Sequence, residues 1–347
     1  MKVWHIFSRA IDNFGDVAIS LRLSYQLSTQ DHCAVILYTE FNKTLQRFFP
    51  NLDITSNVFV SELIEVRNID YVFDDIGIPT YIINVFNIGI PQNYLKKITQ
   101  QTKYIIYEYL SAEQWVNNFH LKPSINANKK LDQIFFFPGF TENTGGLLIE
   151  EVLPRKTGNN LNFFIDKNTF KGLNFSMYAY PNTNLDGFLT IIDDLSLNAK
   201  IYISEVMLQY QNISLDRGKQ VIVYPFIAFD GYDQLLSVCD INFVRGEDSL
   251  VRAIISGKPF IWQPYIQESE THLVKLDAFV EFYFSELKKP LFKIIQSIFN
   301  QWAGGRLSSD SLIAFVKNID EFNQYYHNRS KSLRAQKTVV NNLMEYC

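Results

Sequence analysis

Two aspartates near the start of the chain have a spacing that suits acid and base chemistry. Asp12 and Asp16 bracket Asn13, Phe14 and Gly15 in a polar stretch that follows an apolar run. Carboxylates on a loop after a strand can converge on one substrate group, with one acting as base and the other orienting it. Asp16 could instead only cap a helix that begins one residue later, as aspartates often do. Spacing alone leaves both alternatives open.

The segment Arg245-Gly246-Glu247-Asp248-Ser249 has the composition of a diphosphate site. It lies between an apolar run typical of a strand and a helix-like stretch. A strand-to-helix junction offers free backbone N–H groups and the positive end of the helix dipole, and Gly246 allows a ligand close to the main chain. Arg245 could add a bidentate phosphate contact, while Glu247 and Asp248 could bind sugar hydroxyls. Alternatively, the acidic pair only favours the first turn of a helix.

Aromatic residues in the second half could stack on a planar base, although core packing is their usual role. The candidates are Tyr178, Tyr180, Phe226 and Tyr232. Two further segments, residues 108–113 and 135–146, have the composition of structural turns, and Ser111 in the first of them could cap a helix. We expect structural roles for both segments.

The spacing of histidines and acidic residues does not suggest a metal site. The five histidines are scattered, and the sequence contains no Asp-x-Asp, His-x-His or HExxH pattern. The glycine pattern GxGxxG of dinucleotide-binding folds is also missing after the first apolar run. We therefore expect a reaction that needs no metal and no resident cofactor.

Short apolar runs that alternate with helix-like stretches must position these residues, and they predict parallel sheets covered on both faces. The expected strands of the first half are Val3–Phe7, Ala34–Tyr38, Val58–Val60, Tyr71–Phe73, Tyr81–Val85 and Tyr104–Tyr107. Those of the second half are Phe175–Tyr180, Ile201–Ser204, Val221–Tyr224, Ile241–Val244 and Phe260–Trp262. The expected helices of the second half include Leu185–Asp194, Tyr232–Val238 and Leu250–Ile255.

This alternation predicts an α/β protein with two domains, residues 1–155 and 160–315, joined by a polar linker between residues 150 and 162. A helical tail, residues 316–347, is expected to pack back toward the N-terminal domain. In such folds ligands bind beyond the carboxyl ends of the strands, so we expect the site in a cleft between the domains.

The composition is that of a folded protein in a reducing compartment. Of the 347 residues 47% are hydrophobic, and the 29 Phe and 19 Tyr argue against disorder. With 32 basic and 36 acidic residues, nucleic acid is not expected to be a main partner. Cys33, Cys239 and Cys347 form no CxxC motif, and the chain has neither a signal-peptide core nor an apolar run of about 18 residues. We expect a cytoplasmic protein without a membrane partner.

Four short segments, in order along the chain, together resemble one protein family. They are Ile11–Asp16, Glu108–Glu113, Phe137–Thr141 and Arg245–Ser249. The sequence resembles the EarP family of bacterial protein-arginine rhamnosyltransferases, which modify translation elongation factor P. The resemblance implies a GT-B glycosyltransferase, in which two Rossmann-like domains face a cleft. It also implies that the C-terminal domain holds dTDP-rhamnose, that the N-terminal domain receives an arginine of elongation factor P, and that the anomeric centre is inverted.

The resemblance also implies roles for individual residues. Asp16 would be the base and Asp12 its partner, Glu247 would be essential, and Asn13, Phe14 and Gly15 would bind substrate. Residues Arg245, Gly246, Asp248 and Ser249 would handle the nucleotide sugar. The donor pocket would be lined by Tyr180, Phe226, Phe229, Tyr232 and Tyr265, with the thymine near Phe226. Phe229 stands where family members carry Gln, Tyr232 replaces Phe, and residues 263–270 differ from the usual family pattern.

Two other functions remain open from the residues alone. The chain could be another GT-B nucleotide-sugar transferase or an epimerase without a protein acceptor. It could also be a non-catalytic module that binds elongation factor P or a nucleotide sugar. A pure binding protein would not need Asp12, Asp16 and Glu247 together, which favours an enzyme.

Overall fold

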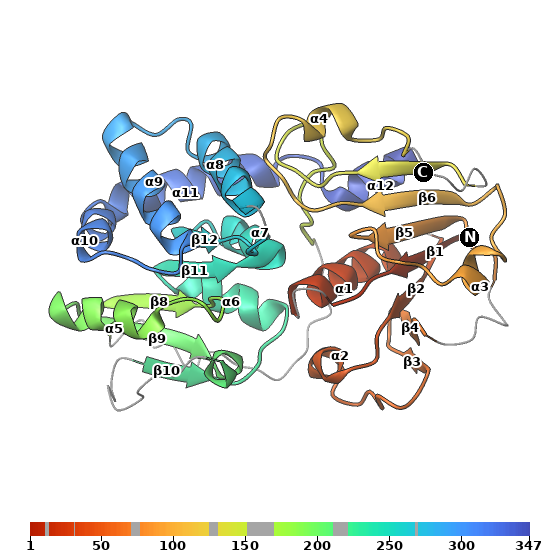
Figure 1. The fold of residues 1–347 in the computed structure, drawn as a ribbon, viewed down its shortest axis with the longest axis horizontal. Helices are drawn as coiled ribbons and strands as arrows, with labels where there is room; N and C mark the ends of the chain where they lie inside the picture. The colour runs from red at the N-terminus through yellow and green to blue at the C-terminus, as the bar shows by residue number, and fades with distance from the viewer. Residues whose placement is uncertain are drawn as a thin grey trace. The chain divides into compact units, whose positions relative to one another are not determined.

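The computed structural model describes residues 1–10, 14–30, 32–70, 77–124, 131–150, 170–210, 221–267 and 270–347. The chain forms two compact units (Figure 1). The first comprises Met1–Pro154 and Gln336–Cys347, and the second comprises Arg155–Ala335. Most of the expected linker, from residue 151 onward, lies outside the described residues.

The first unit is built on a seven-stranded sheet in the order β3-β4-β2-β1-β5-β6-β7. All neighbouring strands are parallel except the antiparallel pair β3 and β4. The strands are β1 (Lys2–Phe7), β2 (Cys33–Thr39), β3 (Val58–Val60), β4 (Glu65–Asn68), β5 (Tyr81–Val85), β6 (Lys103–Tyr107) and β7 (Gln133–Phe136). The carboxyl end of the central strand β1 leads toward the aspartate pair.

Helices cover both faces of this sheet because alternate residues of its buried strands point to opposite sides. On one side, Phe7 of β1 packs against Tyr94 of α3 (Gln92–Leu95), with ring centroids 4.7 Å apart. On the other, Tyr81 donates a 2.7 Å hydrogen bond to the carbonyl of Cys347, next to α12 (Val339–Tyr346). The remaining helices are α1 (Phe14–Ser28), α2 (Lys43–Phe48) and α4 (Val116–Phe119).

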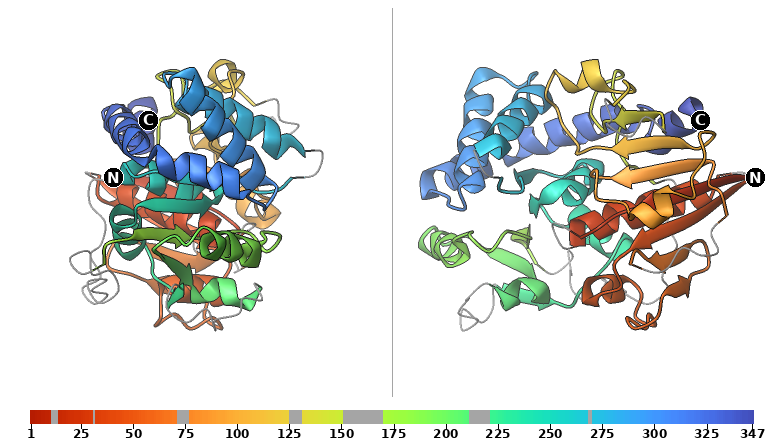
Figure 2. Two further views of the ribbon diagram at one scale, coloured as in Figure 1. Left: turned by 90° about the vertical axis from the view of Figure 1, so that its left-hand side faces the viewer. Right: turned by 45° about the vertical axis from the view of Figure 1, so that its right-hand side comes forward.

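The second unit contains a five-stranded, fully parallel sheet in the order β10-β9-β8-β11-β12. Its strands are β8 (Leu173–Met177), β9 (Ala199–Ser204), β10 (Val221–Tyr224), β11 (Ile241–Arg245) and β12 (Phe260–Gln263). Figure 2 gives two further views of this sheet and its helices. Strand β11 lies between β8 and β12, and its carboxyl end is Arg245.

The two faces of this sheet are also distinguished by alternating residues. Phe243 of β11 packs against Trp302 of α9 with ring centroids 4.5 Å apart, whereas Asn242 donates a 2.9 Å hydrogen bond to the carbonyl of Leu236 in α6. The helical elements are α5 (Leu185–Asp194), η2 (Glu205–Gln209), α6 (Asp230–Val238), α7 (Gly246–Ser256), α8 (Thr271–Tyr283), α9 (Lys289–Ala303), α10 (Ser309–Lys317) and α11 (Ile319–Arg334).

The expected C-terminal tail, residues 316–347, is divided between the units. Helix α11 belongs to the second unit, where Tyr326 donates a 2.6 Å hydrogen bond to the carbonyl of Phe260. Helix α12 belongs to the first unit, where the amide of Val339 donates to the carbonyl of Leu147. None of the helices in the described ranges is long and apolar enough to span a bilayer.

Most of the expected strands and helices are present, some with shifted bounds. The segment Tyr71–Phe73 lies outside the described residues, and β4 was not expected. The strand expected over residues 175–180 ends at Met177, so Tyr178 and Tyr180 lie on the loop beyond it. Helix α7 begins at Gly246, four residues before the expected start, because a glycine with positive φ allows the strand to turn directly into the helix.

Candidate active site

In the first unit, the junction between β1 and α1 positions Asp16. Helix α1 begins at Phe14, so Asp16 lies within its first turn and not at the position before the helix, which contradicts the capping alternative. The Asp16 side chain is 5% exposed, and its backbone carbonyl accepts a 2.8 Å hydrogen bond from Ser20 Oγ. The first turn favours an ionised carboxylate through the helix dipole. Asp12 and Asn13 lie outside the described residues.

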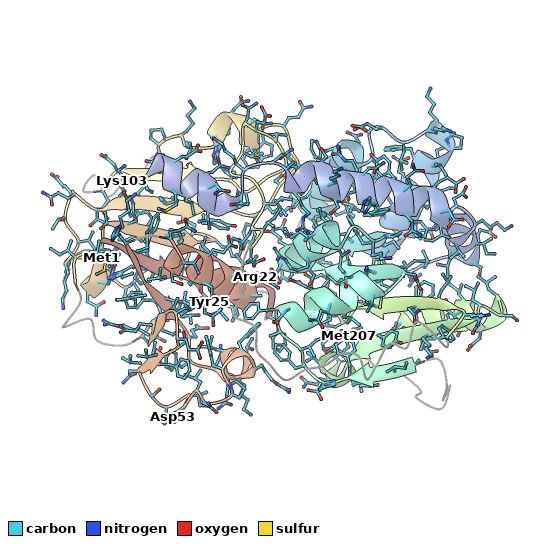
Figure 3. All side chains as sticks on the ribbon, turned by 180° about the vertical axis from the view of Figure 1, so that it is seen from behind. Met1, Arg22, Tyr25, Asp53, Lys103 and Met207 are labelled. Carbon is cyan, nitrogen blue, oxygen red and sulfur yellow. The ribbon has the colours of Figure 1, made fainter. Side chains whose placement is uncertain are left out.

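Contacts within the first unit hold α1 in place. Phe14 lies near Phe48 of α2, with ring centroids 6.3 Å apart, and Gly15 follows in helical conformation. Arg22, labelled in Figure 3, forms a 3.0 Å ion pair with Glu150, and both side chains are at most 2% exposed. Because breaking a buried pair leaves an uncompensated charge, this contact strongly favours one position of the helix.

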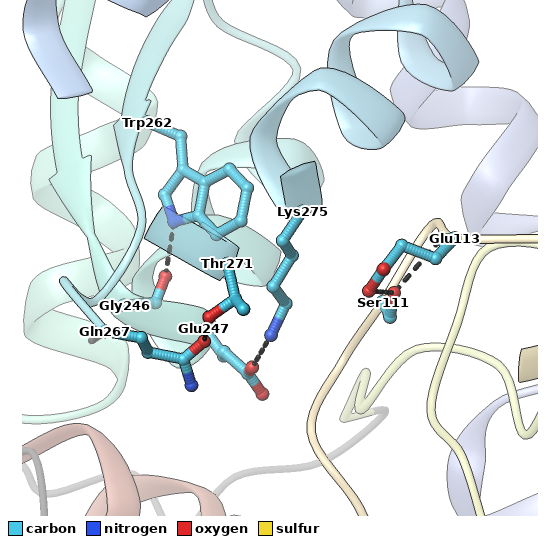
Figure 4. A network of polar contacts seen from close by, with 8 residues as sticks. All are labelled: Ser111, Glu113, Gly246, Glu247, Trp262, Gln267, Thr271 and Lys275. Atoms are coloured by element: carbon cyan, nitrogen blue, oxygen red, sulfur yellow. Dashed lines mark hydrogen bonds and ion pairs between the residues drawn. The ribbon is translucent and has the colours of Figure 1, made fainter. Parts of the chain in front are cut away.

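The two segments expected to be structural do form turns in the first unit. Ser111 Oγ accepts a 3.0 Å hydrogen bond from the amide of Glu113 and donates one of 2.9 Å to its carboxylate, as Figure 4 shows. Ser111 thus closes a turn, while the residue before α4 is Trp115. Gly145 packs so closely against the Phe136 ring that an added Cβ would lie 2.3 Å from it.

In the second unit, β11 passes into α7 without an intervening loop. Gly246 makes the turn with a φ of 66°, and its carbonyl accepts a 2.8 Å hydrogen bond from Trp262 Nε1 of β12. The residue before the helix is Arg245, whose side chain does not cap the helix. The first N–H groups of α7, uncapped by that residue, and the helix dipole together make an anion-binding position.

A group of tyrosines surrounds Arg245, which is 5% exposed. One terminal nitrogen donates to the carbonyl of Ala179 at 3.0 Å and to Tyr210 Oη at 3.1 Å, and the other donates to Tyr178 Oη at 3.3 Å. The guanidinium carbon also lies 4.6 Å from the ring centroid of Tyr180. These contacts fix the plane of the guanidinium. The bidentate phosphate contact of Arg245 stays a prediction.

The acidic residues of α7 each have a cationic neighbour. Glu247 Oε1 lies 2.5 Å from Lys275 Nζ of α8, as Figure 4 shows. Asp248 Oδ1 lies 4.0 Å from the Nε of Arg252, and the Nη1 of Arg252 lies 3.8 Å from Asp233 Oδ2 of α6. Ion pairs therefore connect α7 to two neighbouring helices, α8 through Glu247 and α6 through Arg252.

Aromatic side chains gather at the carboxyl ends of β8, β10 and β12. Tyr180 and Tyr265 meet edge to face at 5.8 Å, and Tyr265 is 46% exposed. Phe226 follows β10, and its amide donates a 3.3 Å hydrogen bond to Glu205. Phe229 precedes α6 with a φ of 46°, a region that bulky residues rarely occupy. Backbone strain of this kind is concentrated at functional sites.

One buried amide nitrogen at this edge, Gln263 Nε2, has no hydrogen-bond partner among the described residues. Gln263 Oε1, in contrast, accepts from the amide of Tyr180 and from Thr183 Oγ1, each at 3.1 Å. Burial raises the pKa of Tyr232 above its ordinary value, so its hydroxyl stays protonated. The same side chain hydrogen-bonds with Ser249 of α7. Unsatisfied buried groups are rare and are typical of sites that are completed by a ligand or water.

The second unit therefore brings its predicted site residues together at one sheet edge. Sequence reasoning missed Tyr210, Gln263, Arg252 and Lys275, and no spacing pattern connects these residues to Arg245 or Glu247. Among the described residues, no group of three or more His, Cys, Asp or Glu side chains could hold a metal ion.

Comparison with solved structures identifies the fold. The chain superposes on a solved EarP structure, reported for arginine glycosylation of translation elongation factor EF-P, with a TM-score of 0.63 and 20% identity over 100% of this chain and 98% of the other. It also resembles the glycosyltransferase VinC in complex with dTDP, with a TM-score of 0.56 and 11% identity over 99% and 98% of the two chains. The fold is that of GT-B glycosyltransferases, as expected.

Comparison with protein sequences identifies the family. A protein-arginine rhamnosyltransferase of Pseudomonas aeruginosa is 32% identical over 335 residues, which covers 89% of each chain. One from Neisseria meningitidis is 30% identical and covers 79% of this chain and 77% of its own. The family model described as elongation factor P (EF-P) rhamnosyltransferase EarP matches residues 4–347. The chain therefore belongs to the EarP family of rhamnosyltransferases.

Proposed function

We propose that this enzyme transfers rhamnose from dTDP-rhamnose to an arginine side chain of translation elongation factor P, with inversion at the anomeric carbon. The family membership supports rhamnosyl transfer to this acceptor. The observation that carries the choice of donor is the β11–α7 junction. There helix α7 begins at Gly246, and the side chain of Arg245 does not cap its N-terminus. Aromatic rings at the same sheet edge could stack on the thymine base.

The second unit would hold the donor. The N–H groups near Asp248 and Ser249 would bind the diphosphate, and Arg245 would add positive charge to the same position. Phe226 is half-buried in the loop after β10, where its ring could stack on the thymine. Glu247, which Lys275 holds at the first turn of α7, would accept a hydrogen bond from a rhamnose hydroxyl.

The acceptor is chemically difficult. A guanidinium is cationic, has a pKa above about 12 and has delocalised nitrogen lone pairs, so it is a poor nucleophile. A carboxylate cannot deprotonate free arginine outright. We assign Asp16 as the base that accepts a hydrogen bond from the attacking nitrogen. We assign Asp12 as the group that orients the guanidinium of the acceptor arginine. Proton transfer then occurs late, when the new bond makes the nitrogen far more acidic.

The transfer step balances without a further reactant. A bond forms between the guanidinium nitrogen and the anomeric carbon, while the bond from that carbon to the dTDP oxygen breaks. The electron pair of the broken bond goes to the diphosphate, where the N–H groups of α7 stabilise the charge. The nitrogen proton goes to Asp16. Attack from the face opposite the leaving group gives inversion.

The intact mass of elongation factor P after incubation with the enzyme and dTDP-rhamnose tests the proposal. We expect a gain of one deoxyhexose, which peptide mapping assigns to an arginine, and NMR of the product shows the inverted configuration. Unchanged protein mass with free rhamnose would instead indicate a hydrolase. No consumption of the donor would indicate a binding protein, and retained configuration would contradict the single displacement.

The proposal includes a cytoplasmic location. None of the three cysteines, all at described positions, forms a disulfide. Free thiols persist in a reducing compartment such as the cytoplasm. Elongation factor P, the proposed acceptor, would be present in the same compartment.

A further inference from the structure

The ion pair between Glu247 and Lys275 joins the first turn of α7 to α8. The two side chains are 14% and 18% exposed, and the N···O distance is 2.5 Å. The chain offers a contrasting pair in the first unit, Lys337 with Glu345, whose side chains are 62% and 59% exposed. Exposed pairs of that kind contribute little, whereas a partly buried pair restricts both side chains.

The docking of α8 does not need this pair. Apolar residues of α8, among them Leu276, Phe279 and Val280, are at most 2% exposed. Phe279 also meets Trp262 of β12 edge to face at 5.2 Å. Since burial of large apolar side chains dominates the stability of such contacts, the lysine adds little to holding the helix. The contact of Lys275 with Glu247 instead restricts the Glu247 carboxylate.

The other cations at this sheet edge have different partners. Arg245 donates to Ala179 and to two tyrosines, and Arg252 lies between Asp248 and Asp233. Lys275 is the cation that the described residues place in direct contact with Glu247. A carboxylate in the first turn of a helix has several rotamers, and one cation from a neighbouring helix selects among them.

We propose that Lys275 is a positioning residue that holds the Glu247 carboxylate in one orientation for the rhamnose of the bound donor. The inference rests on the proposed function, since it assumes that Glu247 meets the sugar. Lys275 itself need not contact substrate. Removing it leaves the diphosphate and base positions intact but lets Glu247 rotate, so the loss falls mainly on turnover.

Steady-state kinetics of five variants test this inference, with elongation factor P and dTDP-rhamnose as substrates. We expect Lys275→Gln to lower kcat at least about 10-fold, while KM for elongation factor P and the Kd of dTDP, which lacks the sugar, change less than about 2-fold. Lys275→Arg restores most of the kcat, because an arginine still supplies a cation. Lys337→Gln, the matched control, removes the exposed pair and leaves kcat unchanged. Glu247→Gln and the Glu247→Gln/Lys275→Gln double variant complete a double-mutant cycle.

If Lys275 acts only through Glu247, its substitution causes no further loss of kcat in the Glu247→Gln background. The inference is overturned by a kcat of Lys275→Gln within 2-fold of the unsubstituted enzyme, by failure of Lys275→Arg to exceed Lys275→Gln, or by fully additive losses in the cycle. The inference is also overturned if the loss of kcat in Lys275→Gln is accompanied by a lowered unfolding temperature of that variant. Failure of the unsubstituted enzyme to glycosylate elongation factor P would instead overturn the proposed function itself, so the two failures are distinguishable.

Discussion

The junction between β1 and α1 in the first unit and the junction between β11 and α7 in the second unit position their candidate site residues in different ways. In the first unit, β1 ends at Phe7 and the candidate base Asp16 lies in the first turn of α1, while residues 11–13 lie outside the described residues. In the second unit, β11 ends at Arg245 and α7 begins at Gly246, so nothing separates strand and helix. The first junction presents the Asp16 side chain from a helix, and the second presents backbone N–H groups.

This difference matches two chemical tasks. A diphosphate is recognised by N–H groups and a dipole whose positions the backbone fixes, so a direct strand-to-helix turn suits it. A guanidinium needs carboxylates, which only side chains supply. The comparison predicts that substitutions at the first junction impair proton transfer, and that substitutions at the second impair donor binding.

The largest expected effect is that of Asp16→Asn. Removing the proposed base should lower kcat by about 10³-fold, while the Kd of dTDP-rhamnose changes little, because the proposed donor site lies in the second unit. Rapid-quench measurement of product formation and calorimetry of donor binding check the two parts. Asp310→Asn changes an exposed aspartate in the first turn of α10 and serves as control. Near-normal turnover of Asp16→Asn would exclude this residue as the base.

The second effect is expected for Arg245→Lys. A lysine lacks the planar guanidinium that donates hydrogen bonds to Ala179, Tyr178 and Tyr210. KM for the donor should therefore rise about 10- to 100-fold. The matching variant of the first unit, Arg22→Lys, weakens the pair with Glu150 and should lower the unfolding temperature without changing donor KM. Equal donor KM values for the Arg245 variant and the unsubstituted enzyme would refute the role of this side chain in the donor site.

The third effect concerns stability in acid and should appear in the first unit. Burial lowers the pKa of His5 to about 3, and the positive charge of Arg67 acts in the same direction. The ring Nδ1 of His5 also pairs with Tyr94 Oη at 2.7 Å. The unfolded chain binds this proton near pH 6.5, so the stabilisation is complete above that pH and is lost as the pH falls toward the folded pKa. Between pH 7 and pH 5 the free energy of unfolding should fall by about 2 kcal/mol from this group.

Hydrogen exchange resolved by peptide checks this expectation in each unit separately. His120, whose pKa burial lowers to about 4, belongs to the same unit and adds to the effect. His5→Gln removes the titrating ring and should reduce the pH dependence of protection in the first unit. Protection that is lost equally in both units and is unchanged in His5→Gln would contradict the assignment.

The smallest effect is expected for Gly246→Ala, and the chain offers a matched control at the other end of α7. Gly246 and Gly257 have the same φ of 66°, and a Cβ on Gly257 would meet Ser330 only at an ordinary 3.5 Å. Each alanine should cost about 1 kcal/mol in the free energy of unfolding, because the left-handed region disfavours a Cβ. Chemical denaturation measures this cost.

Only Gly246→Ala should also raise donor KM, since only that position lies at the proposed diphosphate site. If both glycine variants raise KM equally, the effect comes from α7 as a whole. That result would contradict the assignment of donor binding to the junction between β11 and α7.

Local pattern determined most of the fold. The helix expected over residues 185–194 has those bounds in the structure, and the strands expected at 58–60, 81–85 and 221–224 do as well. Alternating apolar runs of β-branched and aromatic residues favour a parallel sheet wherever helices follow them. The early start of α7 was missed because Glu247 and Asp248 have no apolar periodicity, although they favour a helix N-terminus through the dipole.

The sequence by itself determined which residue types stand at the two junctions, because glycine, aspartate and glutamate act there through local backbone geometry and charge. Only the tertiary structure decided which side chains surround them. Lys275 lies 28 residues from Glu247, and Tyr178 and Tyr210 lie 67 and 35 residues from Arg245. Partners at such separations are brought together by the packing of strands and helices. No local pattern encodes them, because each depends on burial by the rest of the unit.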